Sequence, residues 1–123
     1  MDENGKKSIL LVDDEDENRI LYADFLKTFG GYNVCIAGEE KEALFIFNGK
    51  KKGFFDLLLS DINLPFSDGR DLARKIFEKD SGIKVLLMSG YSNLGGNVMG
   101  FYFIAKPFSI FDLLNNIKSI LGQ

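Results

Sequence analysis

Five polar side chains in this sequence each stand at the end of an apolar run, and together they could carry phosphoryl chemistry. In chain order they are Asp13, Asp14, Asp61, Ser89 and Lys106. If the runs are neighbouring parallel strands, about 4.8 Å apart, their polar ends meet at one edge of a sheet. Three carboxylates in one pocket repel each other unless a divalent cation neutralises them, and oxygen ligands suit Mg²⁺. A lysine and a hydroxyl can bind the remaining phosphoryl oxygens, so the set predicts magnesium-assisted phosphoryl transfer with an aspartate as nucleophile.

Each of these residues also has an ordinary structural role when it is taken alone. Asp14 could cap a helix, and Asp61 could form a turn. Ser89 could be a hydroxyl at a strand end, and Lys106 a surface lysine. The interpretation as a site depends on all of them occurring in order at the same edge of one sheet.

The elements that would position these residues alternate along the chain. Apolar runs predict strands at 8–12, 32–37, 55–60, 83–88 and 101–105. Apolar residues at helical spacing predict helices over 18–29, 39–51, 68–79 and 110–121. Leu21, Phe25 and Phe29 form the apolar face of the first helix, and Ser109 with Asp112 forms a capping box before the last. Strands that alternate with helices predict a parallel sheet covered on both faces, an α/β doubly wound fold.

One stretch, GYSNLGGNVMG, stands where the alternation requires a helix between the fourth and fifth strands. Gly95 and Gly96 each cost a helix about 1 kcal/mol relative to alanine. We therefore expect the fourth helix to be shortened or absent, and the segment to be a mobile loop that orders with activation or a partner.

Composition predicts one domain over residues 1–123, with a flexible N-terminus at residues 1–6. The chain has no histidine, which excludes imidazole bases and zinc sites of the usual kind. A net charge of −3 argues against nucleic-acid binding, and no apolar stretch is long enough for membrane insertion. The single cysteine, Cys35, lies in an apolar alternation that predicts a packing role, and we expect a cytoplasmic protein.

The motifs ILLVDDE, LLLSDINLPFSDG, VLLMSGY and FIAKPF resemble those of response-regulator receiver domains in two-component signalling. The resemblance covers nearly the whole chain, and MSGY with KPFS is similar to receivers of hybrid histidine kinases. It implies a flavodoxin-like, five-stranded parallel sheet in the order 2-1-3-4-5. The shortened fourth helix argues against the family's usual dimer face, which is formed by helix 4, strand 5 and helix 5.

The resemblance also implies roles for individual residues. Asp61 is similar to the phosphorylated aspartate, and Asp13 and Asp14 to the acidic pair that holds Mg²⁺, for which Mn²⁺ could substitute. The carbonyl of Asn63 would be a further metal ligand. Ser89 and Lys106 match the residues that bind the phosphoryl group, and the bond from Lys106 to Pro107 is commonly cis in the family. Pro65 and Gly69 fit the turn after the acceptor strand.

The implied function is transfer of a phosphoryl group from a phosphohistidine to Asp61. Because this chain has no histidine, the donor must be a histidine kinase or histidine phosphotransfer domain elsewhere. Phe103 stands at the position of the family's switch aromatic. It lacks a hydroxyl, so its coupling to Ser89 would be steric; the alternative is that Phe103 is simply core.

Two other functions compete with this interpretation. A haloacid-dehalogenase-type phosphatase also has an aspartate after its first strand and a second acid two residues later, as Asp14 and Asp16 are spaced. Under this interpretation Asp61 would have no role, and this sequence lacks the second acidic motif that such phosphatases have after the lysine. A pseudo-receiver that no longer takes phosphate is disfavoured by the complete set of site residues.

Overall fold

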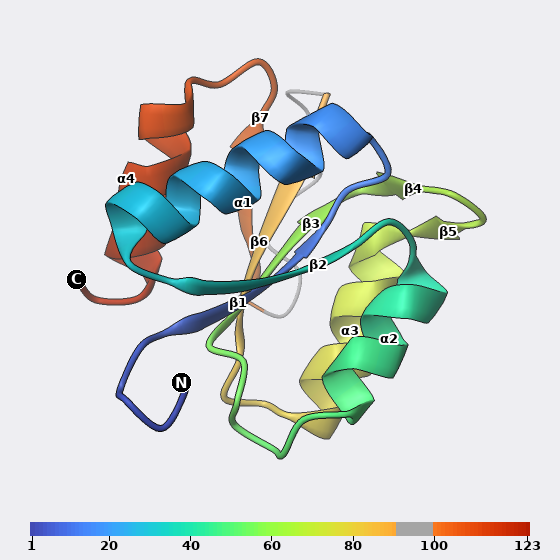
Figure 1. The fold of residues 1–123 in the computed structure, drawn as a ribbon. Helices are drawn as coiled ribbons and strands as arrows, with labels where there is room; N and C mark the ends of the chain where they lie inside the picture. The colour runs from blue at the N-terminus through green and yellow to red at the C-terminus, as the bar shows by residue number, and fades with distance from the viewer. Residues whose placement is uncertain (91–99) are drawn as a thin grey trace.

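The structure is a computed structural model, and it describes residues 1–90 and 100–123. At its centre is a parallel five-stranded sheet (Figure 1). Its strands are β1 (Ser8–Val12), β2 (Asn33–Ala37), β3 (Leu57–Asp61), β6 (Lys84–Ser89) and β7 (Tyr102–Ala105). They lie in the order β2-β1-β3-β6-β7. The predicted order 2-1-3-4-5 is therefore confirmed, with β6 and β7 as the fourth and fifth strands.

Helices cover both faces of the sheet, as the alternation predicts (Figure 1). Within the described residues they are α1 (Asp16–Gly30), α2 (Glu40–Asn48), α3 (Gly69–Lys79) and α4 (Ile110–Ile120). Successive strand residues point to opposite faces, so Leu10 and Leu58 pack toward α2 and α3. Ile9 and Leu57 pack toward α1 and α4. Burial on both faces explains why these strands are continuously apolar.

The ends of the helices follow local capping chemistry. Ser109 and Asp112 form the predicted capping box at the start of α4. The predicted second helix is too long: α2 ends at Asn48, and the backbone N–H of Gly49 donates to the Phe45 carbonyl at 3.1 Å. The lysines at 50–52 therefore follow the helix rather than continue it.

The predicted apolar face of the first helix is wrong. Leu21 and Phe29 are 55% and 65% exposed, whereas Ala23 and Leu26 are buried against the sheet. The stripe of large residues is rotated toward α4, where Phe25 packs edge-on against Phe111. The small side chain of Ala23 lets the helix approach the strands closely, which periodicity alone does not reveal.

A short hairpin, which the sequence does not predict, follows β3. It consists of β4 (Asn63–Leu64) and β5 (Ser67–Asp68). The backbone N–H of Gly69 then donates to the Ile62 carbonyl at 2.7 Å. A Cβ on Gly69 would lie 2.1 Å from the carbonyl oxygen of Asp61, so only glycine fits at the position that leads into α3.

Some predictions concern parts of the chain that the structure does not test. The shortened fourth helix, and the argument against the usual dimer face that depends on it, concern residues 91–99, which lie outside the described residues. Flexibility of residues 1–6 stays a prediction, although Asp2 accepts backbone hydrogen bonds from Asn4 and Lys6. Within residues 1–90 and 100–123, no helix has the length and apolar character to cross a membrane.

Candidate functional site

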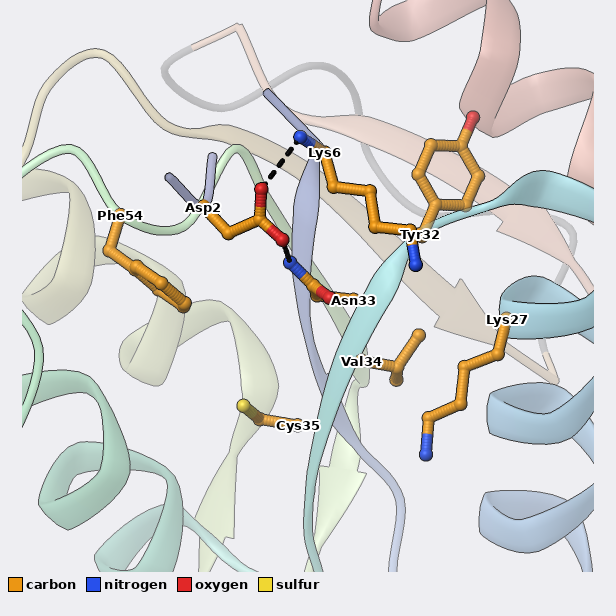
Figure 2. A pocket seen from close by; sticks show the side chains of 8 residues that line it. All are labelled: Asp2, Lys6, Lys27, Tyr32, Asn33, Val34, Cys35 and Phe54. Carbon is orange, nitrogen blue, oxygen red and sulfur yellow. Dashed lines mark hydrogen bonds between the residues drawn. The ribbon is translucent and has the colours of Figure 1, made fainter. Parts of the chain in front are cut away.

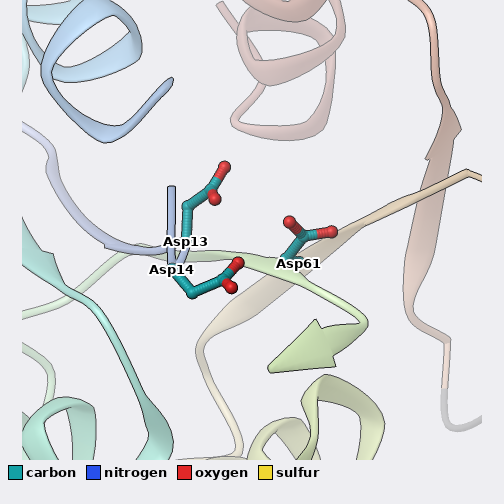
Figure 3. A group of neighbouring side chains, drawn as sticks. All are labelled: Asp13, Asp14 and Asp61. Carbon is teal, nitrogen blue, oxygen red and sulfur yellow. The ribbon is translucent and has the colours of Figure 1, made fainter. Parts of the chain in front are cut away.

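Three carboxylates meet where β1 and β3 end. Pairing of Val12 with Ser60 brings the next residues, Asp13 and Asp61, side by side (Figure 3). One carboxylate oxygen from each of Asp13, Asp14 and Asp61 lies within 4.8 Å of the others. Asp13 is fully buried and Asp61 is 6% exposed, whereas Asp14 is exposed at the mouth. The structure thus brings the predicted acidic residues into one pocket.

Asp13 is a buried carboxylate with a single hydrogen-bond donor among the described residues. Its Oδ1 accepts a hydrogen bond from the backbone N–H of Glu15 at 2.9 Å. Its Oδ2 is buried and has no hydrogen-bond donor within the part of the chain that the structure describes. Burial raises the pKa of Asp13 to about 6, and the charge of Asp61 adds to the effect. A buried carboxylate oxygen that lacks a donor fits a divalent cation, and the acidic triad suits a metal ion.

Lys106 reaches the pocket from the end of β7. Its Nζ donates to both oxygens of Asp61, at 3.0 Å and 2.9 Å. Burial alone would lower the pKa of Lys106, but its hydrogen bond and ion pair with Asp61 raise it. The pKa of Asp61 is nevertheless raised, because its burial outweighs the nearby ammonium. The lysine therefore neutralises one carboxylate and leaves the charge of the other two uncompensated.

Ser89 stands beside this pair at the end of β6 and is 2% exposed. It pairs with Ala105 in the sheet, and its carbonyl accepts a hydrogen bond from the backbone N–H of Lys106 at 2.6 Å. The bond from Lys106 to Pro107 is cis, as the resemblance implies. The sheet register therefore fixes the serine and the lysine relative to each other.

The remaining predicted residues lie around this pocket or in the core. Asn63 is exposed in β4, two residues beyond Asp61, and pairs with Asp68. Phe103 is half-buried and packs against the core cluster on the α2–α3 face. Cys35 packs against the same cluster, as expected.

Two residues of α1 near the pocket were missed in the sequence. Arg19 donates from Nη1 to the carbonyl of Asp13 at 2.7 Å and pairs with Asp16. The spacing of Asp16 and Arg19, three apart on a helix, was a usable signal. Tyr22 packs near Phe108 with ring centroids 5.8 Å apart, and burial raises the pKa of its phenol. No local pattern marks Tyr22, because its place depends on how α1 crosses the sheet.

Asp16 also bears on the phosphatase alternative. Its side chain is 80% exposed and bound to Arg19, and it is not among the clustered pocket carboxylates. The second acid that a haloacid-dehalogenase-type site would need is therefore absent from the pocket, as far as residues 1–90 and 100–123 show.

A hollow of about 460 Å³ lies at the opposite, amino-terminal edge of the sheet (Figure 2). Within it, the Asp2 carboxylate accepts hydrogen bonds from the backbone of Lys6 and the side chain of Asn33. Tyr32, Val34 and Cys35 from the β2 region contribute to its lining. The Asp2 carboxylate already has hydrogen-bond donors within the chain, so this hollow is a weaker candidate for a metal or catalytic site than the acidic pocket.

Comparisons with known proteins agree with this geometry. The family described as the response regulator receiver domain matches residues 9–118. The sensor kinase CckA of Brucella abortus (strain 2308) is 34% identical over 99% of this chain. The chain spans only 13% of that kinase. It is also 31% identical, over 98% of its length, to a protein named as a probable transcriptional regulator, ycf27 of Porphyra purpurea, and spans about half of it.

Solved structures show the same likeness. The receiver domain from hybrid histidine kinase CckA has a TM-score of 0.75 and 35% identity, covering 93% of this chain and 98% of that one. The response regulator TrrA from Thermotoga maritima, in complex with Mg²⁺ and BeF, has a TM-score of 0.80 and 29% identity. The match covers 93% of this chain and 98% of TrrA. A similar structure thus holds Mg²⁺, and the acidic triad of this chain suits a metal ion.

Proposed function

Because this chain belongs to the response regulator receiver domain family, signalling modules rather than classical enzymes, we propose that it accepts a phosphoryl group on Asp61. Receiver domains are phosphorylated by histidine kinases, and the proposed donor is a phosphohistidine on such a kinase or on a histidine phosphotransfer domain. The observation that carries the proposal is the Lys106 ammonium, which contacts both oxygens of Asp61 inside the acidic pocket. We infer a cytoplasmic location from the donor and the single cysteine.

The proposed step is an in-line displacement at phosphorus. A carboxylate oxygen of Asp61 attacks, the phosphorus–nitrogen bond of the donor breaks, and the imidazole keeps the electron pair. An acyl phosphate on Asp61 results. The Lys106 ammonium pairs with the Asp61 carboxylate before transfer and with a phosphoryl oxygen after it. The hydroxyl of Ser89 binds a second phosphoryl oxygen.

Magnesium is the proposed cofactor, with Mn²⁺ as a substitute. Asp13, Asp14 and Asp61, with the carbonyl of Asn63, would hold it, and it would supply positive charge beside the phosphoryl oxygens. The buried Oδ2 of Asp13 supports the proposal, since it has no donor among the described residues.

Phe103 is the proposed switch residue. It lies two residue pairs before Ser89 in the β6–β7 ladder, where Leu87 pairs with Phe103. When Ser89 moves toward a phosphoryl group, the half-buried ring would follow by packing alone, since it has no hydroxyl. The output of the switch would be a changed surface for a partner.

The test is the intact mass of the chain after incubation with acetyl phosphate and Mg²⁺. We expect a gain of one phosphoryl group in the wild type and in Asp71→Asn, a matched change at an exposed aspartate of α3. We expect no gain in Asp61→Asn or when the metal is chelated. Labelling that persists in Asp61→Asn would show that another residue is the acceptor. Continuous release of phosphate from a monoester would favour the phosphatase instead.

A further inference from the structure

Asp14 depends on its neighbours for its place in the acidic pocket. Asp13 and Asp61 stand at the ends of buried strands, whereas Asp14 is exposed, in the loop between β1 and α1. Within residues 1–90 and 100–123 its side chain makes no hydrogen bond or ion pair. Its carboxylate nevertheless turns toward Asp61, with an oxygen within 4.8 Å of one from that residue (Figure 3). The backbone on either side of Asp14 therefore sets the direction of its side chain.

Two peptide groups flank Asp14, and a hydrogen bond holds each of them. The N–H of Glu15 donates to Oδ1 of Asp13 at 2.9 Å, which fixes the group after Asp14. The carbonyl of Asp13 accepts from Nη1 of Arg19 at 2.7 Å, which fixes the group before it. Because a peptide unit is planar, holding its oxygen also holds the nitrogen that begins Asp14. Arg19 thus controls the direction from which Asp14 enters the pocket.

The Arg19 guanidinium is itself held on two sides. Its Nη2 pairs with Asp16, one turn earlier on α1, and 19% of its side chain is exposed. On the other side lies Gly38, in the loop after β2, where a Cβ would stand 3.1 Å from Nη1. That separation is shorter than an ordinary van der Waals contact, so glycine leaves the space that the guanidinium fills. The planar fork of arginine suits this place, because it offers separate donors to a carbonyl and a carboxylate.

We propose that Arg19 is a positioning residue for the metal, which aims the Asp14 carboxylate at a divalent cation by holding the Asp13 carbonyl. The proposal rests on the proposed magnesium site. The bonds of Arg19 run to a carbonyl and to Asp16, which is outside the clustered carboxylates of the pocket.

The charge of Arg19 would have the opposite effect on the metal. A guanidinium beside an acidic pocket repels a second cation, so loss of its charge alone would strengthen binding of Mg²⁺. Loss of its hold on the Asp13 carbonyl would weaken binding instead. Replacement of Arg19 by a neutral residue therefore separates the two effects by the direction of the change.

The test is the affinity of the full chain for Mg²⁺, measured by titration calorimetry. We expect Arg19→Gln to weaken binding about tenfold, the scale of residues that orient metal ligands. Arg74→Gln is the matched control, because Arg74 pairs with an aspartate three residues earlier on α3, and it should leave binding unchanged. At saturating Mg²⁺ the rate of labelling by acetyl phosphate should return to within about twofold of wild type, since the loss is one of metal binding.

Gly38→Ala tests the same contact from the other loop. The φ of Gly38 is not in the left-handed region, so its backbone accepts alanine. The added methyl would displace the guanidinium, and we expect it to weaken Mg²⁺ binding about threefold. In the Arg19→Gln background the same change should have no further effect, because the group that it displaces is gone. Independent effects of the two changes would overturn the contact as the cause.

A measurement without metal separates this proposal from the magnesium site on which it rests. In a chelator, we expect amide hydrogen exchange at Glu15, relative to the core amides of β1, to be at least about threefold faster in Arg19→Gln than in wild type. Arg74→Gln should match wild type. A wild-type chain that binds no Mg²⁺ would overturn the magnesium site itself. Unchanged exchange at Glu15, or unchanged or tighter Mg²⁺ binding in Arg19→Gln when wild type binds the ion, would overturn the positioning role.

Discussion

The two edges of the sheet use buried aspartates in opposite ways. At the amino-terminal edge, Asp80 is 5% exposed and accepts hydrogen bonds from the backbone N–H groups of Gly53 at 2.8 Å and Gly82 at 3.2 Å. At the carboxyl-terminal edge, Asp13 is fully buried, and within residues 1–90 and 100–123 it has one donor, the backbone N–H of Glu15. A buried carboxylate with enough N–H donors joins loops together. One without them remains available to a cation.

Protonation follows the same division. The side-chain hydrogen bond from Asn33 and the backbone bonds from Lys6 and Asn4 lower the pKa of Asp2. Burial raises the pKa of Asp13 to about 6. The hydrogen bonds of Asp2 therefore favour its charged carboxylate, whereas burial in the pocket disfavours the charged form of Asp13 until positive charge is added.

The largest expected effect is at the amino-terminal edge. Asp80→Ala leaves the N–H groups of Gly53 and Gly82 without their acceptor, and we expect it to lower the free energy of unfolding by about 3 kcal/mol. Denaturant unfolding measures this loss, with exposed Asp71→Ala as the control. Acetyl phosphate should still label Asp61 in the folded variant. An effect as small as that of the control would remove the proposed difference between the edges.

At the carboxyl-terminal edge we expect replacement of the buried aspartate to raise the free energy of unfolding rather than lower it. Asp13→Asn removes a buried charge that repels Asp61, so the metal-free chain should gain on the order of 2 kcal/mol of stability at pH 7 to 8. The same change should weaken binding of Mg²⁺, measured by titration calorimetry. Lower stability of the metal-free variant would mean that Asp13 is structural, like Asp80.

The pH dependence of the free energy of unfolding is a second test of the buried charge at Asp13. The folded-state pKa of Asp13 is about 6, above its ordinary value of 3.8, so the folded chain holds this proton more tightly. Tighter proton binding by Asp13 in the folded chain contributes stability that is complete below about pH 4. This stability is lost as the pH rises through about 6.

The measurement is the difference in unfolding free energy between wild type and Asp13→Asn from pH 3.5 to pH 7.5, in a chelator. We expect the advantage of the variant to grow across the window from about pH 4 to 6, by on the order of 2 kcal/mol. Saturating Mg²⁺ should flatten the profile, because a cation favours the charged carboxylate. A profile that is flat without metal would contradict the raised pKa.

The smallest expected effect is at the β4–β5 hairpin, which follows the carboxyl-terminal end of β3. Phe66→Gly removes the strain of a positive φ, and we expect it to raise the free energy of unfolding by about 0.5 to 1 kcal/mol. Thermal unfolding measures the gain. A loss of stability would indicate that the ring packs in a way that its full exposure does not suggest.

Strands and their polar ends were predictable because both depend on local patterns. The apolar run before Asp61 has the length and composition of a buried strand, and its end coincides with the end of β3. The resemblance to receivers supplied the strand order. Parallel pairing then brings Asp13 and Asp61 together without further information.

Other features depend on how the elements pack, and the sequence could not show them. The stripe of Leu21, Phe25 and Phe29 has helical spacing, but Ala23 and Leu26 face the sheet. Strands of two residues, such as β4 and β5, are too short to give a period. Asp13 and Glu40 each have a buried oxygen without a hydrogen-bond partner in the part of the chain that the structure describes, and this is visible only once their neighbours are in place.

The exposed position of Phe66 also makes it a place from which the chain can be observed. The sequence contains no tryptophan, so Phe66→Trp would give the protein a single indole fluorophore. That indole would stand at the tip of the hairpin, five residues after Asp61, with its ring in solvent rather than in the core. Its emission would report, in real time and without a label, whether events at the carboxylates reach the surface of the β4–β5 hairpin.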